Sequence, residues 1–194
     1  MADPHLHWHR RPASQEPPAR ARGRVLDIGA GLDYPLAEVN AVVALECDPA
    51  GQGRLPDRAA PAALTVEVLD ASVAEASFAD ESFDTVVSRM VLCRVPDLEQ
   101  TAAALRRWLR PDGEWLFVEH GIGQGARGRL QRAATPAWSR LAGGCRLDRD
   151  VVGALRRSGW LVTALQHFQL PGAGPLFGDG LCGVARPRLA RAAA

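Results

Sequence analysis

The sequence of 194 residues lacks lysine, and it lacks any pair of cysteines at C-x-x-C spacing. Because lysine is absent, the chain has no G-x-x-x-x-G-K-[ST] phosphate-binding loop and no residue for Schiff-base chemistry. The cysteines are Cys47, Cys93, Cys145 and Cys182. In a chain of this size without a paired spacing, they are expected to be free thiols in a reducing cytoplasm rather than a disulfide framework.

Long apolar runs and an excess of charge are missing as well. No run approaches the roughly 20 apolar residues that cross a bilayer, and the N-terminus has no apolar signal-peptide core. The formal net charge is +1, which gives no case for nucleic acid or an anionic membrane as the main partner. These absences predict a cytoplasmic protein with no membrane span and no nucleic-acid partner.

The length predicts one domain, with segments of different composition at both ends. Residues 1–22 are rich in proline, arginine and histidine and show no apolar periodicity, so they are expected to form a flexible arm. Residues 188–194 are rich in arginine and alanine and are expected to form a flexible tail. The folded domain is therefore predicted to span residues 23–187.

The arm contains a candidate metal-binding pattern. His5, His7 and His9 alternate, so they would share one face of an extended segment. Three imidazoles can bind a metal ion. A solvated arm is the favoured interpretation, because alternating histidines in a polar, proline-rich segment need no ligand, and no metal site is predicted for the chain.

The stretch Arg24–Asp33 contains the most informative motif. A short apolar run leads into Asp27, and Gly29 and Gly31 follow one residue apart. This pattern predicts a buried strand that enters a tight turn, where glycine lets a ligand approach the backbone. A dinucleotide fingerprint would need a third glycine at Tyr34, so it fails. A carboxylate at Asp27 suits a ligand with a cationic end, although a glycine turn in another α/β protein remains the alternative.

A second acid restricts which ligands the predicted site can bind. Residues 41–46 form an apolar strand that ends in Glu46, nineteen residues after Asp27. An acid at this point can accept hydrogen bonds from ribose hydroxyls. A ribose ligand with a cationic end and no phosphate suggests S-adenosylmethionine. The pattern resembles motif I and its following acid in class I S-adenosylmethionine-dependent methyltransferases.

The remaining pattern extends this resemblance. Apolar runs predict strands at 64–69, 82–88, 114–120, 160–168 and 181–185, with a helix opened by Asp97 and another from Asp148 to Arg157. The words VLCRVPD and LRRWLRPDGEWLFVEH resemble the family of mammalian membrane-associated thiol S-methyltransferases and their bacterial relatives, over about residues 24–186. The resemblance implies a Rossmann-like sheet of seven strands, the last antiparallel, with helices on both faces.

The resemblance also implies which residues hold the cofactor. Asp27 would face the amino-acid end of the cofactor, Glu46 its ribose and Asp70 its adenine. Residues at the end of the fourth strand would lie beside its methyl group. The connection over residues 32–40 is short, and Pro35 limits any helix in it to about one or two turns, which departs from the family pattern. The predicted cofactor-binding residues are Asp27, Gly29, Ala30, Gly31, Glu46, Cys47, Asp70, Ala71, Ser88 and Met90.

The sequence says less about the residues that would contact the methyl acceptor. His120 ends the fifth strand and is the candidate general base, with a structural hydrogen-bonded histidine as the alternative. Glu119 either orients it or is buried structure. Cys93 follows the fourth strand, and a buried inert thiol is favoured over a residue of the pocket. Trp138 and Phe177 are candidate walls of the acceptor site.

Three functions remain open at this point. The leading prediction is methyl transfer to a small, rather apolar acceptor. A thiol is the first candidate for that acceptor, since a thiol with a pKa near 8.5 needs little help from a base. The alternatives are O- or N-methylation of a natural product or lipid-like amine, and a subunit that binds S-adenosylmethionine without catalysis. A homodimer or partner subunit that completes a thin lid over the cofactor is also predicted as possible, because little chain precedes the first strand.

Overall fold

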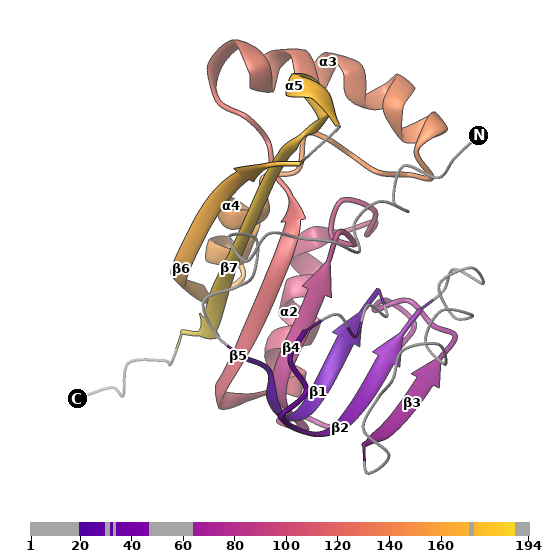
Figure 1. Ribbon diagram of the computed structural model, residues 1–194, viewed down its shortest axis with the longest axis vertical. Coiled ribbons are helices and arrows are strands. Elements are labelled where there is room, and N and C mark those ends of the chain that lie inside the picture. The colour runs from indigo at the N-terminus through magenta and orange to yellow at the C-terminus, as the bar shows by residue number, and fades with distance from the viewer. Residues whose placement is uncertain (1–19, 30–31, 33, 47–63, 171–172, 189–194) are drawn as a thin grey trace.

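A computed structural model describes residues 20–29, 32, 34–46, 64–170 and 173–188 (Figure 1). Several sequence predictions fall outside these residues. They concern the arm with its three histidines, the cofactor residues Ala30, Gly31 and Cys47, and the end of the tail. The predicted domain limits therefore stay a prediction, although the first strand begins at Arg22 and the last ends at Pro187.

The fold is a seven-stranded sheet in the order β3-β2-β1-β4-β5-β7-β6. Neighbouring strands from β3 to β5 pair parallel, and β7 pairs antiparallel with both β5 and β6. The predicted sheet of seven strands with an antiparallel last strand is confirmed. The strands are β1 (Arg22–Ile28), β2 (Glu38–Leu45), β3 (Thr65–Leu69), β4 (Phe83–Arg89), β5 (Leu109–His120), β6 (Trp160–Gln169) and β7 (Asp179–Pro187).

Four helices are described outside the sheet. Figure 1 shows α2 and α4 behind the sheet, and α3 and α5 beyond the end of β5. No helix in the described residues is long and apolar enough to cross a membrane. The helices are α2 (Leu98–Trp108), α3 (Gly125–Leu141), α4 (Val151–Arg157) and α5 (Gly174–Phe177).

Both faces of the central strands are buried, as expected for parallel strands. In β1, Val25 and Leu26 point to opposite faces and are both fully buried. Leu26 belongs to the larger core, which includes the apolar faces of α2 and α4. Val25 belongs to a smaller core on the other face, with Val87 of β4 and Val184 of β7. The sheet centre is therefore a rigid platform for the residues at its strand ends.

The helix caps agree with the sequence prediction in one case and correct it in the other. Asp97 caps α2, and one of its carboxylate oxygens accepts hydrogen bonds from the backbone N–H groups of Glu99 and Gln100. Asp148 was the predicted cap of α4, but Asp150 takes that role. Asp148 instead forms a two-pronged ion pair with Arg146, because both side chains lie in the turn before the helix.

Three further features of the structure depart from what the sequence indicated. The fifth strand begins at Leu109 rather than Glu114, since Pro111 favours an extended residue before it and the helix has already ended at Trp108. The described part of the 32–40 connection contains no helix before β2 begins at Glu38. Helix α3 was not anticipated, because its sequence is arginine-rich and contains Pro136.

Candidate functional site

Those predicted cofactor residues that the structure describes lie at the carboxyl ends of β1 to β4. Ile28, at the end of β1, pairs with Leu45 of β2 and with Ser88 of β4. Leu45 pairs in turn with Leu69 of β3, so the strand ends are in register. Neighbouring strands are about 4.8 Å apart. The residues that follow these ends form a row, and its members across the sheet are Asp70, Glu46, Gly29 and Arg89.

The turn after β1 is held in shape by Asp27. This side chain is 1% exposed, and its Oδ2 accepts a hydrogen bond of 2.9 Å from the backbone N–H of Leu32. Gly29 has a φ of +86°, which is the left-handed region that favours glycine. A Cβ at Gly29 would lie 3.4 Å from the carbonyl oxygen of Arg89 and from Val91. The glycine thus leaves space for no more than a methyl group between the ends of β1 and β4.

Glu46 and Asp70 carry acids to the ends of β2 and β3. Glu46 is half-buried, and its backbone N–H donates to the carbonyl of Leu69, which ties the two strand ends together. Asp70 is exposed, and Ala71 beside it is half-buried against the core. Together with Asp27, the row offers three carboxylates and an open glycine backbone, which fits a ligand with a cationic end, a ribose and an adenine amino group.

The end of β4 shows an unusual backbone. Met90 has a φ of +53° although it carries a side chain, and its N–H donates to the carbonyl of Val118 at 2.8 Å. Such conformations cost free energy and gather at functional sites. The hydroxyl of Ser88, by contrast, is buried and accepts a hydrogen bond from the Trp115 indole, so that hydroxyl serves the core.

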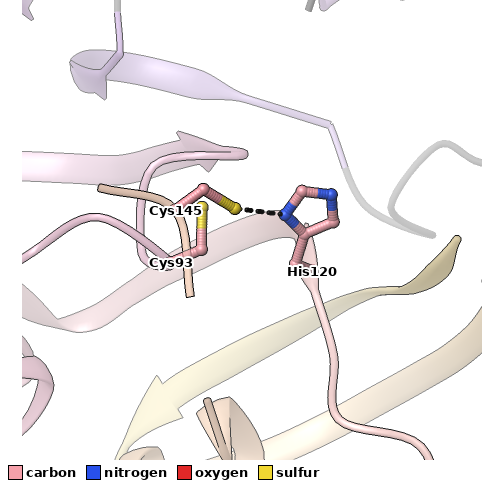
Figure 2. A group of neighbouring side chains, drawn as sticks. All are labelled: Cys93, His120 and Cys145. Atoms are coloured by element: carbon pink, nitrogen blue, oxygen red, sulfur yellow. Dashed lines mark hydrogen bonds between the residues drawn. The ribbon is translucent and has the colours of Figure 1, made fainter. Parts of the chain in front are cut away.

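His120 ends β5 and belongs to a buried cluster with two thiols (Figure 2). Its ring is 5% exposed, and its Nδ1 lies 3.2 Å from Sγ of Cys145. Cys93, from the turn after β4, completes the group, and one ligating atom from each residue lies within 4.8 Å of the others. A hydrogen bond from Cys93 and another from His120 lower the pKa of the Cys145 thiol to about 4, against the opposing effect of burial.

Glu119 has a separate, structural role. The side chain is fully buried, and its Oε2 accepts a hydrogen bond of 3.0 Å from the backbone N–H of Leu92. Burial raises the pKa of this carboxyl to about 8. Because successive residues of a strand point to opposite faces, Glu119 is directed away from the His120 ring. Of the two sequence interpretations, the structure supports buried structure that fixes the turn after β4.

The two aromatic residues predicted as acceptor walls meet each other. Trp138 of α3 stacks on Phe177 of α5, with ring centroids 4.4 Å apart and an interplanar angle of 21°. Trp138 also packs against Cys93 and Cys145. The stack therefore borders the thiol cluster. Cys145 was not singled out from the sequence, and the only local signal is the pair Gly143-Gly144 before it, which marks a sharp turn.

Comparison with known proteins agrees with this arrangement. Residues 26–117 match a family described as a methyltransferase domain. Human thiol S-methyltransferase TMT1A is 38% identical over 95 residues, which cover 48% of this chain and 39% of the human protein. The chain thus matches well under half the length of this relative.

Solved structures show the same fold. YcgJ from Bacillus subtilis superposes with a TM-score of 0.68 at 16% identity, covering 89% of this chain and 95% of that one. An S-adenosylmethionine-dependent methyltransferase from Mesorhizobium loti gives a TM-score of 0.65 at 19% identity, covering 87% and 93%. At these identities the likeness concerns the fold. The matched family covers residues 26–117, just under half of the chain, and the fold is one that an S-adenosylmethionine-dependent methyltransferase shares.

Proposed function

We propose that this protein uses S-adenosylmethionine to methylate a small, rather apolar thiol. The observation that carries the proposal is the register of the strand ends, which sets Asp70, Glu46 and Gly29 in one row. Asp27 lies two residues before Gly29, and Met90 and His120 follow the ends of the next strands, β4 and β5. The named activity of human TMT1A supports a thiol as the acceptor.

The cofactor would be held by the row described above. Asp27 would take the cationic amino group, Glu46 the ribose hydroxyls and Asp70 the adenine amino group, with Gly29, Ala30 and Gly31 packed along it. Cys47, Ala71, Ser88 and Met90 complete the proposed set. When bound, S-adenosylmethionine supplies an electrophilic methyl carbon on a positively charged sulfur.

The chain's own residues would then position the acceptor and exclude water. Methyl transfer needs the nucleophile in line with the methyl carbon and little else, so positioning in a dry site is the main requirement. Leu92 and Cys93 are fully buried at the end of β4, which makes this region apolar. Nδ1 of His120 is directed at Cys145, and Figure 2 shows the other ring nitrogen on the far side, where it can face an acceptor.

The first test is binding of S-adenosylmethionine and S-adenosylhomocysteine by calorimetry. We expect micromolar binding of both, and at least about tenfold weaker binding by Glu46→Ala because two ribose hydrogen bonds to a charged group are lost. Glu67→Ala is the matched control, since Glu67 is an exposed acid within β3. Near-normal affinity of Glu46→Ala would remove Glu46 from the ribose role, and absent binding by the wild-type chain would contradict the cofactor assignment.

The second test is an acceptor screen with the cofactor present. Methylation of small apolar thiols, in preference to phenols and amines, is the expected result. Turnover of phenols or amines alone would favour the O- or N-methyltransferase alternative. Cofactor binding without turnover of any acceptor would favour the non-catalytic subunit that the sequence left open.

A further inference from the structure

The buried cluster at the end of β5 brings together three side chains that ligate metals. Cys93 comes from the turn after β4, His120 from the end of β5, and Cys145 from the turn after α3. Their exposed fractions are 0%, 5% and 0%, and one ligating atom of each lies within 4.8 Å of the others (Figure 2). Two thiols and an imidazole held this close can share protons through hydrogen bonds, as between Cys145 and His120, or can bind a cation together.

We propose that Cys93, His120 and Cys145 bind one zinc ion, and that its fourth coordination position is open to the sulfur of the acceptor. Two sulfurs and an imidazole nitrogen form a donor set that favours zinc, whereas magnesium and calcium prefer oxygen ligands. In a tetrahedral zinc site, with bonds of about 2.3 Å to sulfur and 2.0 Å to nitrogen, the sulfur and nitrogen are about 3.5 Å apart. The observed 3.2 Å between Cys145 Sγ and His120 Nδ1 needs a shift of only tenths of an ångström.

The backbone around the cluster holds the ligands in place. The carbonyl of Cys93 accepts a hydrogen bond of 3.0 Å from the N–H of Arg146, which joins the two cysteine turns. Gly143 and Gly144 have φ values of +56° and +86°, and this left-handed pair turns the chain sharply after α3 so that Cys145 points inward. A site built on such fixed turns can keep its geometry without the ion.

The ligand count distinguishes a catalytic site from a structural one. Structural zinc sites have four protein ligands, whereas catalytic sites have three and an open position. The described residues supply three ligands. The nearest additional acid along the chain is Glu119, whose carboxylate is held by the N–H of Leu92. Among the described residues no fourth ligand joins the group, and we assign the fourth position to a water molecule or to a substrate sulfur.

The position of the cluster fits methyl transfer, and this part of the inference rests on the proposed function. An acceptor thiol that binds zinc releases its proton to solvent and is held as a thiolate. A sulfur lone pair then forms a bond with the methyl carbon, the bond from that carbon to the cofactor's sulfur breaks, and its electron pair stays on that sulfur. The neutral thioether product binds zinc more weakly than the thiolate and can leave.

Zinc content is the decisive measurement. The full chain is purified with zinc present, passed through gel filtration and analysed by elemental mass spectrometry, with an expected content of about one zinc per chain. Cys93→Ser, His120→Ala and Cys145→Ser should each bind zinc at least about tenfold more weakly, because even loss of an outer partner costs that much. Cys182→Ser is the matched control, since Cys182 is another fully buried thiol outside the cluster.

Cobalt provides a readout that does not depend on activity. Replacing zinc by cobalt should give thiolate-to-cobalt absorption in the near ultraviolet, reduced by about half in each single cysteine variant, with circular dichroism showing that the variants are folded. Folded wild-type protein that takes up neither zinc nor cobalt would overturn the site. So would a Cys93–Cys145 disulfide whose reduction restores no metal binding.

Calorimetry separates the two proposals. Zinc binding with no binding of S-adenosylmethionine would leave the metal site standing and would contradict the proposed function. Binding of both, with thiol methylation unchanged in a folded, zinc-free Cys145→Ser variant, would overturn the role of zinc in acceptor activation.

Discussion

Gly29→Ala tests whether the glycine after β1 is needed for ligand binding or only for the backbone conformation of the turn. Gly29 has a φ of +86°, and Gly159, after α4, has a φ of +81°. An L-residue in this region costs about 1–2 kcal/mol, and alanine returns about 0.4–1 kcal/mol by restricting the unfolded chain. Neither new Cβ meets an atom closer than 3.4 Å. The two substitutions should therefore destabilise the fold equally, by about 1 kcal/mol, or about 2–4 °C in melting temperature.

Binding should separate the two variants. The Gly29 methyl group would fill the space beside Arg89 and Val91, where the proposed cofactor packs, whereas the Gly159 methyl group faces the flexible end of Arg106. We expect Gly29→Ala to bind S-adenosylmethionine at least about tenfold more weakly, a change of about 1.4 kcal/mol, and Gly159→Ala to bind normally. Calorimetry and thermal melting of both variants check this. Equal affinities, or a Gly29→Ala variant that binds like the wild type, would refute the reasoning.

Two further predictions concern stability and can be checked by denaturant unfolding. Leu155→Ala should cost about 2–5 kcal/mol because this fully buried side chain anchors α4 in the larger core, whereas Leu141→Ala should stay within about 0.5 kcal/mol because Leu141 is 83% exposed. Similar losses for both would contradict the core assignment. Asp97→Ala should cost about 1 kcal/mol by leaving two N–H groups of α2 without their cap, and the exposed Asp112→Ala should cost little. An unchanged Asp97→Ala variant would show that water caps α2 as well as the carboxylate does.

The sheet could be predicted from the sequence because its signals are local. The run before Asp27, the alternation before Asp70 and the apolar run before His120 each identify a strand within a few residues. The antiparallel last strand of the sheet was implied by the resemblance to a family, since periodicity alone does not determine which strands pair or in what order.

The elements that were missed depend on distant contacts. Helix α3 has weak apolar periodicity and contains Pro136, and its packing depends on α5, which is far along the chain. The cluster of Cys93, His120 and Cys145 has no spacing signal, because its members are brought together by three separate turns. The cap of α4 was misplaced by two residues because Asp148 and Asp150 are both good caps, and only the ion pair to Arg146 decides between them.

The chain order of the site has a consequence for how new specificities can arise. The described residues of the proposed cofactor row all precede α2, whereas His120, Cys145 and the stacked aromatics follow it. Apart from Cys93, which lies in the turn after β4 and so before α2, the proposed donor and acceptor residues therefore lie in separate, consecutive stretches of the sequence. Exchange of the segment from the end of β5 to the start of α4 between relatives would change the acceptor while the donor half is inherited intact. Recombination at α2 is therefore a natural route by which such a scaffold diversifies.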